Sequence, residues 1–101
     1  MKDTSDIVII GGGVTGCAAA YYLSSLGVSP TIIESTDIAS QASGYAAGGL
    51  NPLEGYEIPG LLSDFAMNSY RMHLNLWNQL QDSTGIDYHG RVLNLLKVCY
   101  D

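Results

Sequence analysis

Residues 7–34 read IVIIGGGVTGCAAAYYLSSLGVSPTIIE, and this stretch decides the fold. A run of β-branched residues leads directly into a glycine-rich turn, a helix-like stretch follows, and a second apolar run ends at Glu34. This order is typical of a β-α-β unit, in which a helix connects two parallel strands. An acidic residue at the end of the second strand is the further feature by which such units bind a dinucleotide. We therefore predict an α/β fold with a Rossmann-like, dinucleotide-binding β-α-β unit.

The glycine turn has a steric reason for each of its key positions. Gly11 makes the tight turn after a strand whose composition predicts burial on both faces. Gly13 lies where a Cβ atom would keep the backbone away from a pyrophosphate, and Gly16 lies where the new helix presses on the strand. Val14 and Thr15 begin the helix, whose free N–H groups and positive dipole end attract an anionic pyrophosphate without a lysine.

The second strand, residues 31–33, ends at Glu34, which lies 18 residues after Gly16. A carboxylate at this place accepts hydrogen bonds from both ribose hydroxyls of an adenosine and repels a 2′-phosphate. Ser35 follows directly and is included in the predicted site, and Gly27 is placed to end the intervening helix. NADP is therefore disfavoured, while FAD and NAD both fit.

The composition excludes several classes of partner. Ten acidic residues against four basic ones give a formal net charge of −6, without a lysine or arginine cluster, so we expect neither nucleic acid nor an anionic membrane surface as a partner. No apolar run reaches the roughly 18 residues of a membrane span, and the acidic N-terminus does not resemble a signal peptide. Two cysteines without a CxxC pattern fit the cytoplasm, and two scattered histidines predict no metal site. We interpret Cys17 as a small packed residue rather than a reactive thiol.

A stretch rich in small residues follows, and residues 42–52 read ASGYAAGGLNP. A flexible linker is one interpretation, but the alanines, tyrosine and leucine suit burial, and small residues let the backbone approach a flat ligand. Together with the glycine turn and the acid, this stretch resembles the FAD-dependent oxidoreductases of the D-amino-acid oxidase, glycine oxidase and sarcosine oxidase type. The resemblance covers essentially the whole chain and implies FAD as the cofactor.

The resemblance also implies that residues 43–50 run along the pyrophosphate and ring of the flavin. Many relatives have an arginine and an asparagine where this chain has Tyr45 and Ala46, so we expect backbone contacts there rather than side-chain contacts. The predicted cofactor-binding residues are Gly11, Gly13, Val14, Thr15, Gly16, Glu34, Ser35, Ser43, Gly44, Ala46, Ala47, Gly48 and Gly49.

A long amphipathic helix is predicted over residues 61–81 from apolar residues spaced three or four apart. Ser63 or Asp64 can cap its start, and Gly85 can end it. We expect its apolar stripe to pack in the core rather than to line a substrate site. The stripe consists of Leu62, Phe65, Ala66, Tyr70, His73, Trp77 and Leu80.

The tail of the chain, residues 90–100, has the apolar composition of a strand buried on both faces. In the family that the chain resembles, such a strand opens the substrate-binding domain. We therefore assign residues 1–85 to the N-terminal part of an FAD-binding domain and residues 86–101 to the start of a truncated substrate domain.

The resemblance implies an oxidoreductase whose small-molecule substrate is an amino acid or a secondary amine, oxidised by hydride transfer to the flavin. The arginine and tyrosine that hold the substrate in such enzymes would lie beyond Asp101, so no catalytic residue is named and the 101-residue piece alone is expected to be inactive. Two other functions stay open: an NAD-dependent dehydrogenase, and a non-catalytic dinucleotide-binding fragment. The sequence does not indicate how many subunits assemble.

Overall fold

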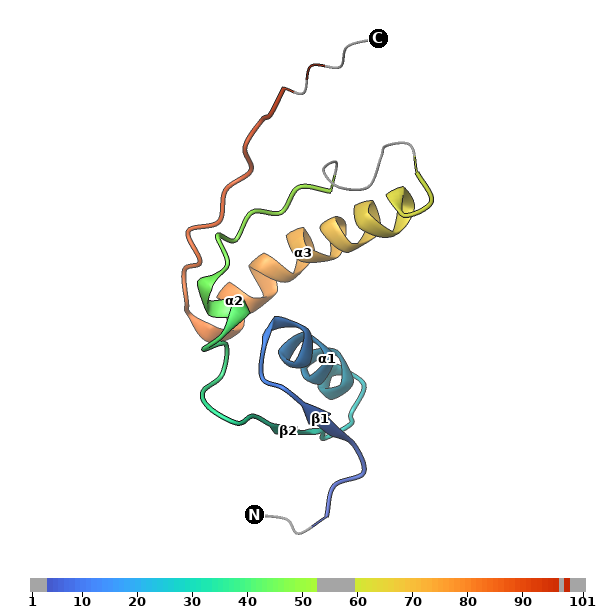
Figure 1. Cartoon of the computed structure of the whole chain (residues 1–101), viewed down its shortest axis with the longest axis vertical. Helices are drawn as coiled ribbons and strands as arrows, with labels where there is room; N and C mark the ends of the chain where they lie inside the picture. The colour runs from blue at the N-terminus through green and yellow to red at the C-terminus, as the bar shows by residue number, and fades with distance from the viewer. Residues whose placement is uncertain (1–3, 53–59, 97, 99–101) are drawn as a thin grey trace. The chain divides into compact units, whose positions relative to one another are not determined.

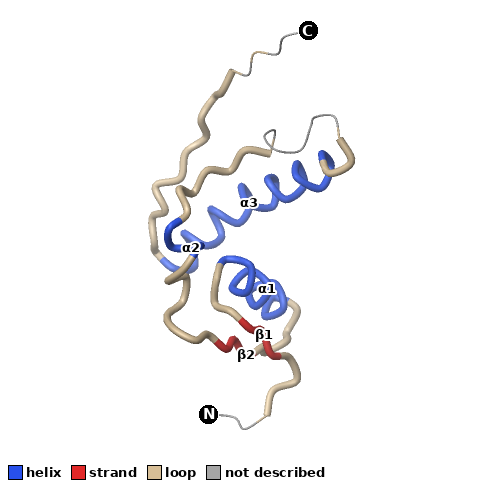
Figure 2. Tube along the Cα trace, viewed as in Figure 1, coloured by secondary structure: helices blue, strands red, loops and turns tan. Residues whose placement is uncertain are grey.

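The structure is a computed structural model of the chain, and it describes residues 4–52, 60–96 and 98. The elements in chain order are β1 (Val8–Ile10), α1 (Val14–Ser25), β2 (Thr31–Ile33), α2 (Ala42–Tyr45) and α3 (Ser63–Thr84), labelled in Figure 1 and coloured by type in Figure 2. The chain divides into two compact units, Met1–Gly49 and Leu50–Asp101, and each is described by itself.

The first unit is a β-α-β unit. β1 and β2 pair in parallel, with Val8 opposite Thr31 and Ile10 opposite Ile33. The helix α1 connects the two strands and packs on both of them, as Figure 1 shows. Two parallel neighbours require such a crossover, because the chain must return to the end of the sheet from which it started. The predicted α/β fold with a Rossmann-like start and a long following helix is confirmed.

The helix α1 ends in a Schellman motif. The N–H of Gly27 donates to the Ser24 carbonyl and the N–H of Val28 donates to the Leu23 carbonyl, both at 3.0 Å. Gly27 has a φ of 81°, a left-handed conformation that glycine adopts without a steric penalty. The prediction that Gly27 ends this helix is confirmed.

The strands are covered on one face only. Ile9 and Ile32 are half-buried, whereas Val8 and Ile10 are 49% and 88% exposed. The prediction that the first strand is buried on both faces is therefore wrong for this structure, because one helix shields only one side of a two-stranded sheet. None of the hydrophobic side chains that the structure describes is fully buried.

The second unit contains the 22-residue helix α3. Gly85 ends it as predicted, with a φ of 69° and an N–H that donates to the Gln81 carbonyl at 2.8 Å. At its start, however, Leu62 is the capping residue, and neither Ser63 nor Asp64 is. Ser63 is instead the first residue of the helix. Its hydroxyl accepts the Gly60 N–H at 2.7 Å and its N–H donates to the Gly60 carbonyl at 3.0 Å, so both groups belong to a turn with Gly60.

The apolar stripe of α3 is only partly shielded. A Cβ atom at Gly90 would lie 3.2 Å from the Trp77 ring, so the segment that follows the helix crosses this ring. Phe65 is 72% exposed, which contradicts its predicted place in the core.

The tail differs from its predicted strand. Residues 90–96 and 98 form no strand, since a strand requires a partner and no described segment pairs with them. The rest of the predicted strand, residues 97, 99 and 100, lies outside the described residues. The domain assignment of residues 1–85 and 86–101 stays a prediction.

The closest packing in the first unit lies at Gly16. A Cβ atom there would collide with the Gly11 carbonyl oxygen and would lie 3.3 Å from Cγ2 of Ile9. We expect Gly16→Ala to lower the free energy of unfolding of the intact gene product by about 1–3 kcal/mol, the scale of overpacking, measured by denaturant unfolding. Ala19→Ser adds one atom on the exposed side of α1 and should change stability by no more than about 0.5 kcal/mol. Equal stability of the two variants would contradict this account.

Candidate functional site

The glycine turn and the loop after β2 meet at the carboxyl ends of the strands, where open parallel sheets bind their ligands. Three hydrogen bonds join them. The Gly12 N–H donates to Oε2 of Glu34 at 2.7 Å, the Ala39 N–H donates to the Gly12 carbonyl at 3.0 Å, and the Val14 N–H donates to Oγ of Ser43 at 2.9 Å. These bonds gather residues 22 to 29 positions apart in the sequence around one site.

Glu34 is held by donors on both carboxylate oxygens. Oε1 accepts the backbone N–H groups of Ser35 and Thr36 at 2.8 and 3.0 Å, and the two hydroxyls at 3.2 and 3.3 Å. Oε2 accepts the Gly12 N–H and has no second donor among the described residues. The Gly12 N–H, followed by the Thr36 N–H, lowers the pKa of the Glu34 carboxyl to about 2. Glu34 is therefore ionised at neutral pH, and Oε2 is the oxygen with room for a ligand hydroxyl.

The N-terminus of α1 already binds an oxygen atom. The Ser43 hydroxyl accepts the first N–H of the helix, and a Cβ atom at Gly13 would lie 3.1 Å from that same oxygen. Gly13 thus leaves the space that an oxygen needs above the helix end. A phosphate oxygen would meet the same N–H group and the same positive dipole end, so the geometry fits the pyrophosphate of a dinucleotide.

Residues of both groups line one cavity of about 160 Å³. Glu34 belongs to its lining, and so do Gly13 and Ser43 from the helix end. The lining residues are Gly13, Glu34, Asp37, Ala39, Ser40, Gln41, Ala42 and Ser43. The pairing of an ionised acceptor with an anion-binding helix end suits an adenosine ribose and its phosphates.

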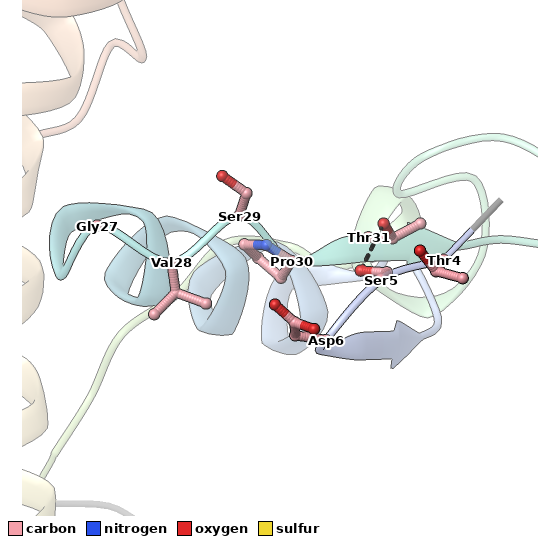
Figure 3. Close-up of a pocket in the computed structure, with 8 residues that line it drawn as sticks. All are labelled: Thr4, Ser5, Asp6, Gly27, Val28, Ser29, Pro30 and Thr31. Carbon is pink, nitrogen blue, oxygen red and sulfur yellow. Dashed lines mark hydrogen bonds between the residues drawn. The ribbon is translucent and has the colours of Figure 1, made fainter. Parts of the chain in front are cut away.

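A larger cavity, of about 1000 Å³, opens before the strands begin, at their amino ends (Figure 3). It is lined by Thr4, Ser5, Asp6, Gly27, Val28, Ser29, Pro30 and Thr31. The Thr31 hydroxyl donates to the Ser5 hydroxyl there at 3.0 Å. Because this is the end of the sheet opposite the glycine turn, we assign no cofactor to it.

Sequence comparison places the chain among known proteins. Residues 6–101 match the family described as FAD dependent oxidoreductase. The chain belongs to this family of FAD-dependent oxidoreductases. It is 31% identical over 100 residues to the glycine oxidases of Bacillus licheniformis and Bacillus subtilis, which covers 99% of this chain and 27% of each of them. It is also 35% identical over 79 residues to the tRNA 5-methylaminomethyl-2-thiouridine biosynthesis bifunctional protein MnmC of Burkholderia thailandensis, covering 77% of this chain and 12% of that protein.

The chain thus spans about a quarter of the length of the glycine oxidases that it matches. FAD is the cofactor of this family, which confirms the cofactor expected from the resemblance. The alternative of an NAD-dependent dehydrogenase is set aside by the same match.

The predicted site residues of the family's glycine turn take the expected backbone places. Gly11 has a φ of 100° and its N–H donates to the Ile33 carbonyl at 2.8 Å, which makes the tight turn at the end of β1. Thr15 lies exposed in the first turn of α1, and Gly16 packs on the turn. Contact of these residues with FAD stays a prediction.

The small-residue segment behaves differently. Gly44 packs against the Ala39 carbonyl, with which a Cβ atom would collide. Residues 46–49 are exposed, and so are Tyr45 and Leu50, at 86% and 44%. The predicted burial of this segment is not met within the described residues, because none of them packs over it. Its contact with the flavin, at Ala46, Ala47, Gly48 and Gly49, stays a prediction.

Several residues of the site were not predicted from the sequence, among them Gly12, Ala39 and Thr36. Gly12 is buried and its peptide group binds Glu34 and Ala39, but the glycine motif leaves this position unspecified. Ala39 has a left-handed φ of 57°, for which its residue type is no signal. Thr36 contacts Glu34 with both its N–H and its hydroxyl, and only its nearness to Glu34 could have indicated this.

Two further expectations concern metals and membranes. The described residues contain no group of three or more histidine, cysteine or acidic side chains able to hold a metal ion. Among the same residues, the structure has no helix with the length and apolar character needed to cross a membrane.

Cys17 is half-buried and its thiol donates to the Gly12 carbonyl at 3.4 Å, in agreement with a packed residue.

The lowered pKa of Glu34 predicts how stability changes with pH. The pKa falls from an ordinary 4.5 to about 2 on folding, so the stabilisation is complete above about pH 4.5 and is lost as the pH falls towards 2. Two other titratable groups lie near Glu34: Asp37 lines the same cavity, and the thiol of Cys17 in α1 donates to the Gly12 carbonyl of the glycine turn. We expect the intact protein without FAD to melt at a higher temperature than Glu34→Gln at about pH 6, with the difference shrinking at about pH 3. A difference that stays constant with pH would contradict this assignment.

Proposed function

We propose that the whole protein is an FAD-dependent enzyme that oxidises an amino acid or a secondary amine. The observation that carries this proposal is the pairing of the ionised Glu34 with the oxygen-binding end of α1, in a chain of the FAD-dependent oxidoreductase family. Glycine oxidases and MnmC among its relatives support amine chemistry, whereas 31% and 35% identity do not identify one substrate.

The residues of this chain would hold the adenosine half of the cofactor. Oε2 of Glu34, which accepts the Gly12 N–H, would also accept a ribose hydroxyl, and the N-terminus of α1 at Val14 and Thr15 would bind the pyrophosphate. Residues 43–49 would run along the cofactor towards the flavin ring. FAD, when bound, accepts a hydride from the carbon that bears the amino group. Binding and orientation are thus the work of this part of the chain.

Substrate-binding groups are proposed to lie outside these residues. None of the described side chains at the cavity is a cation that could bind a substrate carboxylate: the charged groups there are the carboxylates Glu34 and Asp37. A non-catalytic dinucleotide-binding fragment is the alternative, and the reading frame after Asp101 distinguishes the two. We also propose the cytoplasm as the compartment, on the strength of the cysteine pattern alone.

The intact gene product should carry FAD and oxidise an amine. We expect the purified protein to show flavin absorption bands, and to reduce that flavin anaerobically with at least one member of a panel of glycine, N-methylglycine and small D-amino acids. The isolated 101-residue chain, as the matched control, should turn over none of them. A protein that lacks flavin absorption and whose melting temperature rises with NAD would refute the proposal. Amine oxidation by the isolated 101-residue chain would refute the expectation that this piece is inactive.

Removal of the Glu34 carboxylate should weaken cofactor binding. Because a ribose hydroxyl that donates to a carboxylate forms a charge-assisted hydrogen bond, Glu34→Ala should raise the dissociation constant for FAD by a factor of about 10 or more. Titration of the protein without FAD, followed by flavin fluorescence, measures this. Asp64→Ala removes an exposed carboxylate from α3 and should leave the affinity unchanged. Equal affinity of the Glu34 variant and the wild type would exclude Glu34 from the site.

A further inference from the structure

We infer that Thr36 is a positioning residue, which fixes the Glu34 carboxylate for the ribose and ties it to the loop that carries Ser43. The inference rests on the proposed function, since it concerns how the same site holds FAD. Glu34 and Ser43 both line the cavity, and Thr36 belongs to neither the glycine turn nor the small-residue segment.

The hydrogen bonds of Thr36 have a defined direction. Its Oγ1 lies 3.3 Å from Oε1 of Glu34 and 2.9 Å from Oγ of Ser40. A threonine hydroxyl has one proton, and an ionised carboxylate has none to donate. The carboxylate is also the stronger acceptor of the two neighbours. The Thr36 proton therefore goes to Glu34, and Ser40 donates to Thr36, which gives a relay of Ser40 to Thr36 to Glu34.

This relay anchors a loop that needs to be held. Ser40 follows Ala39, whose left-handed φ of 57° is unfavourable for alanine, and whose N–H binds the Gly12 carbonyl at 3.0 Å. Three residues later, the Ser43 hydroxyl reaches the first N–H of α1. A bond from Ser40 back to Thr36 fixes this loop on its other side. The ribose acceptor and the phosphate-binding helix end are thereby joined through Thr36.

The relay also favours the ionised form of Glu34. The N–H groups of Gly12 and Thr36, which a valine at position 36 would keep, lower the pKa of Glu34 most. A hydroxyl donor also stabilises the carboxylate relative to the neutral acid, so we expect its loss to raise that pKa to a smaller extent. The other charged side chain on the cavity wall is Asp37, the Cys17 thiol faces the glycine turn from α1, and the lining contains no lysine or arginine. A change in the pH at which acid halves FAD binding therefore reports on the protonation of Glu34 and on the groups that donate to it.

The test is Thr36→Val in the intact protein, which keeps the shape and the N–H of Thr36 and removes the hydroxyl. We expect its dissociation constant for FAD at neutral pH to rise about three- to tenfold, and the pH at which acid halves FAD binding to rise as well. Thr36→Ser should restore both values. Ser40→Ala should give a smaller loss of affinity, and the double variant should lose less than the sum because both changes break one relay.

Thr31→Val is the matched control. It makes the same substitution in β2, where the hydroxyl that is lost donates to Ser5 and to no other described residue (Figure 3). Thr31→Val should bind FAD with the affinity of the wild type, and the pH at which acid halves its FAD binding should not change. An equal effect of Thr31→Val and Thr36→Val, or no effect of either, overturns the inference while the proposed function stands. If Thr36→Val does not fold, Ser40→Ala decides by the same two readouts. Failure of the wild type to bind FAD removes the proposed function and this inference with it.

Discussion

The peptide group of Gly12 is the point on which the first unit depends. Its N–H donates to Glu34 at 2.7 Å, and its carbonyl accepts both the Ala39 N–H and the Cys17 thiol. The backbone of one buried residue, Gly12, thus joins the end of β2, the loop after it and the first turn of α1. Because a buried peptide group without partners is costly, the turn, the acid and the loop must take up their places together. A site assembled in this way is formed before a ligand arrives, which lowers the entropy lost on binding.

Under the proposed function, the same arrangement gives the ribose end and the phosphate end of the site different chemistry. At the ribose end the acceptor is a full charge, fixed by five donors and left with free capacity on Oε2. At the phosphate end the donor is a helix terminus, whose first N–H holds the neutral Ser43 hydroxyl. A phosphate oxygen binds a helix terminus more strongly than a neutral hydroxyl does, because it carries charge. Under the proposed function, the positive end of α1 would favour a phosphate oxygen beside the Ser43 hydroxyl, whereas the charge of Glu34 would repel a 2′-phosphate.

Sequence reasoning was most successful where backbone geometry restricts the residue type. The β-α-β order, the turn at Gly11, the close packing at Gly16 and the helix ends at Gly27 and Gly85 all follow from steric rules that a sequence displays. It was less successful where the result depends on what packs nearby. Two-sided burial of β1, the core position of Phe65 and a strand after residue 90 each require a partner segment, and the residue itself cannot indicate whether one is present. Thr36 beside Glu34 was missed for another reason, since threonine occurs in loops of every kind.

The exposure of the apolar residues bears on how the cofactor and the fold support each other. The described residues bury no hydrophobic side chain, and the sheet has one open face. Stability within this part of the chain therefore rests more on local hydrogen bonds and close backbone contacts than on a core, and several of those hydrogen bonds converge on Gly12 and Glu34. A ligand that binds the folded site alone stabilises it by an amount that grows with the logarithm of its concentration over its dissociation constant. Under the proposed function, FAD would bind the loop and turn at the points where they hold each other. Its binding energy would therefore stabilise the β-α-β unit directly, so that in this part of the chain cofactor retention and folding stability depend on the same few contacts.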